Sequence, residues 1–401
     1  MKSTRDIVSF LGSSLSLVII FTASATPIPL YGTYRSVDGL TYGDLSLSAV
    51  VYFAGALISL LLFGRLSNFW GRKMVSMLSL LIAAIGCITL IFVHDPMPLL
   101  TGRFMQGLSC GLASTAIAAW IVDSSSGVAK WLAPAVISCG PMTGLTFGGI
   151  GSGTLVEYGP YPRILPYIAV LALLVICILI ITKGRETMTR QPGVLKSILP
   201  RLALPPSARQ AYPAAACTFV CTWAVGGFFQ AFGPAMAHEQ LHSSSAVAAA
   251  LVFASIMAPS VLGASIASRF RPVQAQIFGM LMFTASLGGL LLSLKFGVLV
   301  IFLITSALAG LAQGIVLTGS IQSMVSDLAP EERANVLSVV YATSYTGAAI
   351  PTLIAGQLSQ VFSLLQVACA YGILAAVGCL FVLISVRLRI QSQNRAILVN
   401  K

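Results

Sequence analysis

Apolar residues in this chain occur in runs of about 20, separated by short polar segments from one end to the other. A helix of that length crosses roughly 30 Å of hydrocarbon and satisfies its own backbone polar groups. The pattern therefore predicts an all-α integral membrane protein without a sizeable soluble domain. We expect twelve transmembrane helices, near residues 7–30, 45–64, 74–93, 98–122, 132–156, 163–182, 213–236, 246–267, 273–294, 298–325, 335–357 and 364–386.

The first apolar run has a second interpretation. Lys2 and Arg5 precede it, and Ala23-Ser24-Ala25 resembles a signal-peptide cleavage site. Apolar character continues past that point to Leu30, however, and removal would leave eleven spans. We therefore interpret the run as the first membrane helix.

Composition agrees, since 57% of the residues are hydrophobic and only 8% are charged. The net charge of +12 would suggest nucleic acid in a soluble protein, but here the positions of the cations decide its meaning. With the N-terminus inside, nineteen of twenty-three Lys and Arg residues lie in cytoplasmic segments; the others are Arg35, Arg103, Arg163 and Lys295. This bias predicts the inner (cytoplasmic) membrane, both termini cytoplasmic, and no nucleic-acid partner.

Weak internal repetition divides the chain into halves. Gly64, Gln106 and Asp123 are echoed by Gly263, Gln313 and Asp327, at offsets of 199, 207 and 204 residues. We expect an N-terminal six-helix half over 1–182, a basic cytoplasmic linker over 183–212 and a C-terminal six-helix half over 213–401. Within the linker, residues 194–202 are predicted to form a short helix on the membrane surface.

Three stretches resemble signatures of the major facilitator superfamily of secondary transporters. "GRLSNFWGRK" is similar to the loop signature G-x-L-x-D-x-x-G-R-K, and it falls between the second and third predicted helices as in that family. "RFMQGLSCG" resembles the fourth-helix signature R-x-x-Q-G, and "GLTFGGIGSG" resembles the glycine-rich antiporter signature of the fifth helix. The resemblance implies two pseudo-symmetric halves that alternate access to a central cavity for a small-molecule substrate, in a chain expected to act as a monomer.

In the loop signature, glycines allow a tight turn and the basic pair stays on the cytoplasmic side. The family's acidic residue latches the outward-facing state, but Asn68 occupies that position here, so we expect a weaker latch. A simple loop anchor is the alternative. The candidate switch residues are Gly64, Asn68, Gly71, Arg72 and Lys73.

Arg103 is the most informative single residue, because an ionised guanidinium inside a span is costly without a polar partner or a water-filled cavity. It shares a helical face with Gln106. We interpret it as functional; snorkelling toward the outer surface is the alternative.

The fifth helix has a smooth face that includes Gly144, Gly148, Gly149 and Gly153, along which another helix could slide. Plain small-residue packing is the alternative. Gly149 stands where the family's antiporters have proline, which weakens the inference of export.

In the family's fold, helices 1, 4, 7 and 10 surround the cavity. For any single aromatic residue in these spans, the alternative to lining the cavity is contact with lipid or with a neighbouring helix. The candidate cavity residues are Arg103, Gln106, Trp223, Gln230, Gln313 and Gln322, together with Tyr341 and Tyr345 on helix 11.

All eleven acidic residues lie at or beyond the ends of predicted spans. A cation carrier usually needs a buried negative charge, so the predicted cargo is neutral or anionic and modestly apolar. If protons are the coupling ion, Asp44 at the outer mouth of the second helix or Asp123 at the inner end of the fourth is the predicted site.

The segment His238-Glu239-Gln240-Leu241-His242 matches H-E-x-x-H, the zinc-protease pattern. We expect it to lie in a short outer loop, and we expect no further domain that could supply a third ligand and a cleft. All eight cysteines lie inside predicted spans, where we interpret them as packing residues. We therefore expect no metal, no cofactor and no enzymatic activity.

The leading hypothesis is a secondary transporter that exports a small molecule with protons as counter-ion. Proton-coupled uptake of a metabolite is the alternative, followed by a zinc membrane protease and a non-transporting sensor. No P-loop pattern is present, which disfavours an ATP-driven pump.

Overall fold

The computed structural model describes residues 4–129, 131–189, 191–192, 204–325, 328 and 330–399. The predicted linker helix and Asp327 fall outside these residues, and those two predictions remain expectations. The division of the chain at residues 182 and 212 also remains a prediction.

In the part of the chain that the structure describes, the N-terminal region contains seven helices of eight or more residues and several short segments. Their bounds are α1 Thr4–Ala25, η1 Ile28–Leu30, α2 Tyr31–Asp38, α3 Tyr42–Phe63, α4 Ser67–Trp70, α5 Arg72–Ile91, α6 Pro96–Leu112, η2 Ala113–Ile117, α7 Ala118–Asp123, α8 Leu132–Tyr158 and α9 Leu165–Thr182.

Among the described residues, the C-terminal part has six long helices. Its bounds are α10 Pro206–Arg209, α11 Tyr212–Ala235, η4 Met236–Gln240, α12 Ala246–Ala267, α13 Pro272–Phe296, α14 Leu299–Val325, α15 Pro330–Leu358 and α16 Leu364–Val399.

The predicted all-α membrane architecture is confirmed. Eleven helical stretches of the described chain are long and apolar enough to cross a membrane. The glycine-rich α8 has 27 residues and packs along both α1 and α12, so it completes a set of twelve. Its glycines, serines and threonines lower its hydropathy, and it is not among those eleven stretches.

Local signals fix where several helices begin and end. Thr41 and Asp44 form a reciprocal capping box at the start of α3, and the Asp95 side chain accepts from Met97 N at the start of α6. Gly297 ends α13 with a φ of 68°, a left-handed conformation that glycine adopts without strain.

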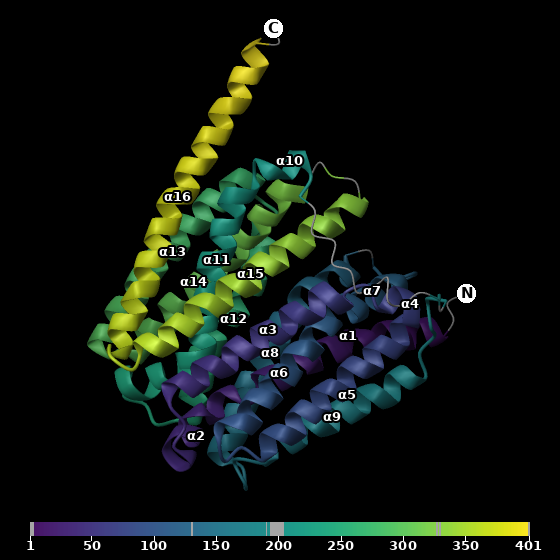
Figure 1. Cartoon of the computed structure of the whole chain (residues 1–401), viewed down its shortest axis with the longest axis vertical. Helices are drawn as coiled ribbons and strands as arrows, with labels where there is room; N and C mark the ends of the chain where they lie inside the picture. The colour runs from purple at the N-terminus through teal and green to yellow at the C-terminus, as the bar shows by residue number, and fades with distance from the viewer. Residues whose placement is uncertain are drawn as a thin grey trace.

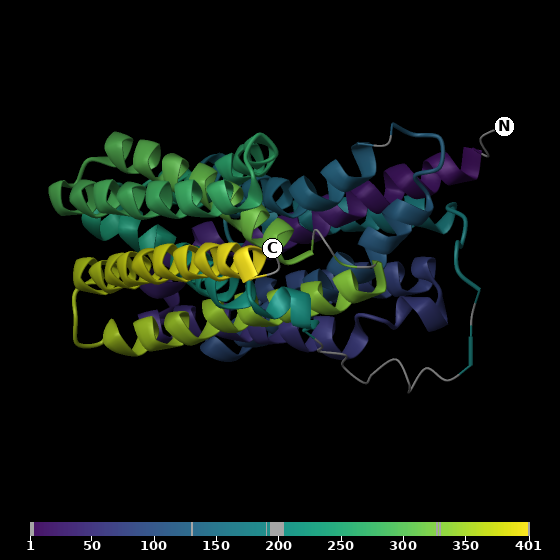
Figure 2. The ribbon, with the colours of Figure 1, turned by 90° about the horizontal axis from the view of Figure 1, so that it is seen from above.

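The helices gather in two groups. Figures 1 and 2 place the N-terminal helices on one side and the C-terminal helices on the other, with α3 and α15 side by side between them. The groups converge near α2 and diverge toward α4, α7 and α10 (Figure 1). We call these the α2 end and the amino-terminal end; both chain termini lie away from α2.

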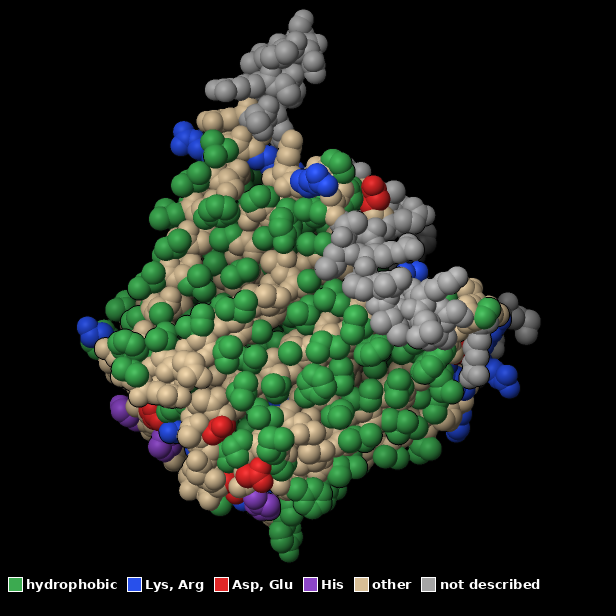
Figure 3. All heavy atoms as spheres, viewed as in Figure 1, with side chains coloured by type: hydrophobic (Ala, Val, Ile, Leu, Met, Phe, Trp, Pro, Cys, Tyr) green, Lys and Arg blue, Asp and Glu red, His purple; other side chains and the backbone are tan. Residues whose placement is uncertain are grey.

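Side-chain type varies with position along the bundle. Hydrophobic side chains cover most of the visible face in Figure 3, while Asp, Glu and His gather at the α2 end. Many Lys and Arg side chains lie toward the termini (Figure 3). An apolar band between polar ends is the surface that a bilayer requires.

Candidate functional site

A cavity of about 330 Å³ lies between the two helix groups. Both groups contribute to its wall: Tyr52 and Phe53 come from α3, and Trp223 and Tyr345 come from α11 and α15. Its aromatic lining is Phe21, Tyr52, Phe53, Phe219, Trp223, Phe253, Tyr341 and Tyr345.

Four of these rings form a continuous series of contacts, and the contact between Phe53 and Tyr345 joins the two groups. The ring centroids of Trp223 and Tyr345 are 4.9 Å apart at 67°, an edge-on arrangement favoured by the ring quadrupoles. Tyr345 in turn lies 6.3 Å from Phe53, which packs edge-on to Tyr52 at 5.4 Å. The wall is therefore a connected aromatic surface that crosses from one group to the other.

Two glutamines give this surface its polarity. Gln230 on α11 and Gln313 on α14 are 5% and 4% exposed, and both line the cavity. The Oε1 atom of each has no hydrogen-bond partner. A buried carbonyl without a donor is costly, so both oxygens are suited to accept from a bound molecule.

Among the described residues that line the cavity, none is Asp, Glu, Lys, Arg or His. A charged solute that entered this cavity would lose its hydration shell, and no side chain of opposite charge would compensate that loss. The lining therefore favours a neutral solute.

Arg103 and Gln106 do not line this cavity. The Arg103 side chain is fully buried, and its Nη1 donates to the carbonyl of Ser24 and to Gln106 Oε1 at 2.9 Å. Gln106 Nε2 donates to the carbonyl of Ala23 at 2.7 Å. The pair thus holds α6 against α1, and Arg103 does not snorkel to the surface.

Tyr52 separates this pair from the cavity. The Arg103 guanidinium lies 4.4 Å from the Tyr52 ring centroid, a cation–π distance, while Tyr52 itself faces the cavity. Arg103 Nε and Nη2 have no hydrogen-bond partner. Any influence of Arg103 on a solute would therefore act through the Tyr52 ring.

The structure brings five of the eight candidate cavity residues together: Trp223, Gln230, Gln313, Tyr341 and Tyr345. Gln322 is half-buried on α14 and is not part of the lining. Sequence reasoning missed Tyr52 and Phe53, because it considered helices 1, 4, 7 and 10 first. An adjacent aromatic pair in the second span was the available signal.

The loop signature folds onto its own half of the molecule. Arg72 donates from Nη1 to Asn68 Oδ1 at 2.6 Å and from Nε to Asp123 Oδ2 at 3.0 Å. The Glu186 carboxylate accepts from the backbone N–H groups of Arg72 and Lys73 at the start of α5. Lys73 Nζ donates to the carbonyls of Thr182 and Gly184 at the end of α9.

The two loop glycines differ. Gly71 has a φ of 98°, which favours glycine. Gly64, which directly follows α3, has an ordinary helical φ of −57°, but a β-carbon there would come within 2.4 Å of the Leu60 carbonyl oxygen. Both positions therefore favour glycine, Gly71 because of its backbone conformation and Gly64 because of this close approach.

The predicted glycine face of α8 consists of two separate faces, each of which packs against a different helix. β-Carbons at Gly144 and Gly148 would come within 2.3 Å and 2.2 Å of the α1 backbone oxygens of Val18 and Thr22. Gly149 and Gly153 instead face α12 of the other half. Only this second pair lies where the two halves meet.

The two candidate proton sites have different surroundings. Asp44 Oδ2 accepts from the backbone N–H and the hydroxyl of Thr41, so its carboxylate caps α3. Asp123 ends α7 and accepts from Arg72 and from the Thr187 hydroxyl at 3.1 Å. Neither lines the central cavity.

The H-E-x-x-H match does not form a metal site. Residues 236–240 form a π-helical turn, and His242 follows with a φ of 52°, so the two histidines are not one α-helical turn apart on one face. His238 lines a pocket at the α2 end, whereas His242 lies beside Gly297. No cluster of three metal-ligating side chains occurs among the residues whose placement is described.

These features define an all-helical, multi-pass membrane protein built from two bundles around a shared cavity. A family model described as Major Facilitator Superfamily matches residues 13–351, and the chain belongs to that superfamily. It is therefore a member of a transporter family and not a zinc protease.

Two curated relatives match shorter stretches. "Sugar transporter ERD6-like 8" of Arabidopsis thaliana is 33% identical over 86 residues, 21% of this chain and 18% of that protein. "Uncharacterized MFS-type transporter YybF" of Bacillus subtilis (strain 168) is 33% identical over 135 residues, 33% of each chain. The matched stretches thus span a third or less of these relatives.

Solved structures agree in fold over nearly the whole length. A bacterial homologue of the human lysosomal transporter Spinster superimposes with a TM-score of 0.74 at 12% identity, covering 98% of this chain and 99% of that one. The nucleoside transporter NupG gives a TM-score of 0.68 at 12% identity, with 96% and 99% coverage. At such identity the likeness concerns the fold alone.

Proposed function

We propose that the protein is a secondary transporter that carries a small, neutral, partly aromatic solute with hydrogen-bond donors. The central cavity supports this proposal most directly: both halves line it, its described lining has no charged side chain, and Gln230 and Gln313 present unpaired carbonyl oxygens. Rings of the solute would pack against Trp223 and Tyr345, and its N–H or O–H groups would donate to the glutamines.

The transport mechanism we propose is alternating access. The halves converge at the α2 end and diverge at the amino-terminal end (Figure 1), as an inward-facing state would if the termini are cytoplasmic. The distribution of Lys and Arg supports that orientation and a place in the inner membrane. The transport unit is proposed to be the monomer, because one chain supplies both walls of the cavity.

Protons are the proposed coupling ion and export the proposed direction. Asp123 suits proton coupling better than Asp44, because its ion pair with Arg72 belongs to the switch loop and would change when that loop moves. Asp44 is occupied as a helix cap. Uptake of a metabolite is the alternative direction, since Gly149 replaces the antiporter proline.

The test is the accumulation of labelled neutral, anionic and cationic aromatic compounds in cells with and without the protein. We expect lower accumulation of at least one neutral compound, abolished by a protonophore. Higher accumulation would reverse the direction, and a response only to anions would contradict the neutral-solute proposal. No change for any compound would count against transport of this solute class.

A further inference from the structure

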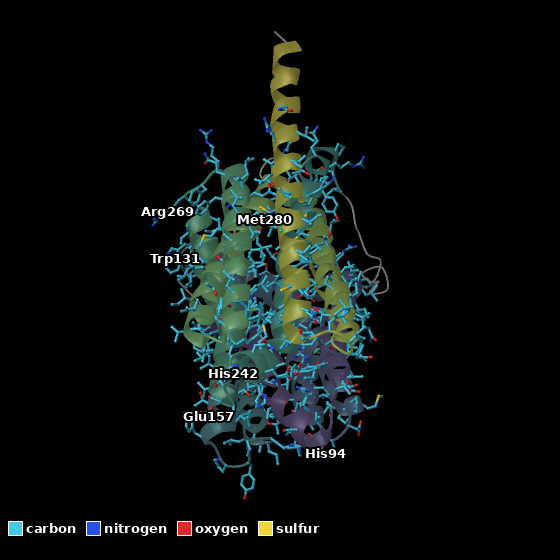
Figure 4. All side chains as sticks on the ribbon, turned by 90° about the vertical axis from the view of Figure 1, so that its left-hand side faces the viewer. His94, Trp131, Glu157, His242, Arg269 and Met280 are labelled. Carbon is cyan, nitrogen blue, oxygen red and sulfur yellow. The ribbon has the colours of Figure 1, made fainter. Side chains whose placement is uncertain are left out.

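A second and larger pocket opens at the α2 end of the molecule. Its volume is about 870 Å³, and both halves line it, with Tyr31, Arg35 and Glu157 from the first and Pro234, His238 and Ser245 from the second. Figure 4 places Glu157, His94 and His242 toward this end, away from Arg269. We call it the outer pocket.

The outer pocket and the central cavity follow one another along α11 and α12. On α11, Gln230 lines the central cavity and its neighbour Ala231 lines the outer pocket. On α12, Phe253 lines the central cavity and Ala249 lines the outer pocket. Four residues of α-helix rise about 6 Å, so the partition between the two spaces is about one helical turn thick.

The partition is made where the two halves touch. A β-carbon at Gly149 of α8 would come within 3.1 Å of the Phe253 ring, and one at Gly153 within 2.6 Å of the Ala250 side chain. The partition therefore depends on contact between α8 and α12, which belong to different halves. Separating these helices at the α2 end would join the two spaces.

Two acidic side chains tie the halves together around the outer pocket. Glu239 Oε1 lies 3.1 Å from Arg35 Nη1, across the halves. Glu157 at the end of α8 accepts from the Ser245 hydroxyl and from Val247 N–H at 2.9 Å. Glu157 thus places a negative charge at the N-terminus of α12, where exposed N–H groups and the helix dipole favour it.

We propose that the outer pocket is the outer mouth of the transport path, and that Glu157 and Glu239 are positioning residues that keep the partition between this mouth and the central cavity closed. The inference rests on the proposed transport function. Loss of either contact favours separation of α8 from α12 and hence the outward-facing state. The two contacts involve different partners, so their effects combine multiplicatively.

The test measures directly whether the partition between the outer pocket and the central cavity opens. Met257 lines the central cavity one turn beyond Phe253, so a cysteine there is shielded from the α2 end by the partition. In a chain without its eight native cysteines, Met257→Cys is treated in whole cells with a membrane-impermeant maleimide. Ser244→Cys, at an exposed position in the outer pocket, verifies that this end faces the reagent.

We expect Glu157→Ala and Glu239→Ala each to accelerate labelling of Met257→Cys roughly two- to fivefold, and the double variant by about the product. Labelling of Ser244→Cys should stay unchanged. The charge exchange Arg35→Glu with Glu239→Arg should restore slow labelling, which a merely destabilised fold would not do. Glu157→Gln and Glu239→Gln repeat the test if an alanine variant fails to fold.

Unchanged labelling in the glutamate variants, or no recovery on charge exchange, would overturn the positioning role. Solute transport by the same variants separates this outcome from failure of the proposed function. If labelling changes but no transport is detected, the outer-mouth proposal stands and transport of the tested solutes is refuted. Normal transport with unaltered labelling would refute only the closure by Glu157 and Glu239.

Discussion

Two sets of polar side chains are similarly buried but differ in what their hydrogen bonds do. Arg103 and Gln106 donate hydrogen bonds to α1 carbonyls and do not line the central cavity. Gln230 and Gln313 face the cavity with unpaired oxygens. A polar residue inside a span can thus serve either as an interhelical tie or as a ligand for a solute, and its partners distinguish the two.

The largest expected effect comes from breaking the first set. Arg103→Ala should lower the free energy of unfolding by about 2–3 kcal/mol, because it removes charge-assisted hydrogen bonds and leaves Gln106 Oε1 unpaired. Unfolding in detergent micelles measures this change, with the exposed Arg209→Ala as the matched control. Intact stability combined with lost solute binding would instead put Arg103 in the solute path.

An intermediate effect is expected from the second set. Gln230→Leu and Gln313→Leu should each weaken binding of the solute by about 1 kcal/mol, roughly fivefold in Kd, while the stability of the fold is unchanged or slightly higher. Equilibrium binding of whichever compound the wild type recognises measures it. Gln322→Leu, on the same helix as Gln313 but outside the lining, should bind as the wild type does. Equal losses in all three variants would contradict the assignment of the cavity.

The smallest expected effect concerns the switch loop. Asn68→Asp would replace a neutral acceptor of Arg72 by a charged one, and a pair at this partly exposed position contributes about 0.2–1 kcal/mol. The bond is present in this structure, which we propose to be inward-facing, so a stronger bond stabilises this state and labelling of Met257→Cys from the α2 end should fall, by less than about fivefold. A rise would instead support the outward-facing latch expected from the family resemblance. Asn68→Leu, similar in size but without an acceptor for Arg72, is the control and should not slow the labelling.

The apolar runs were sufficient to predict the twelve spans, because hydrocarbon thickness sets helix length and every backbone group must be satisfied within the helix. The family resemblance, carried by short stretches such as Gly64 to Lys73, was also correct. α8 shows the limit of hydropathy alone: its small residues lower its apolar character, and its place in the bundle identifies it as a span.

The candidate site was predicted only in part. Trp223, Gln230, Gln313, Tyr341 and Tyr345 share the cavity as expected, whereas Arg103 and Gln106 lie behind Tyr52. Sequence spacing gives the face that a residue shares with its neighbours on one helix, but not which helix that face meets. For this reason the sequence did not predict the contacts that Arg35, Glu157 and Glu239 make across the halves.

The sequence by itself determined the environment of this protein, the number and length of its helices and its family, since these depend on hydrophobicity and local spacing along one chain. The tertiary structure alone decided which polar groups face the cavity, which glycines of α8 meet the other half, and at which end the two helix groups converge. Those features depend on how helices far apart in sequence rotate and pack against one another, and packing geometry is not encoded in any single helix.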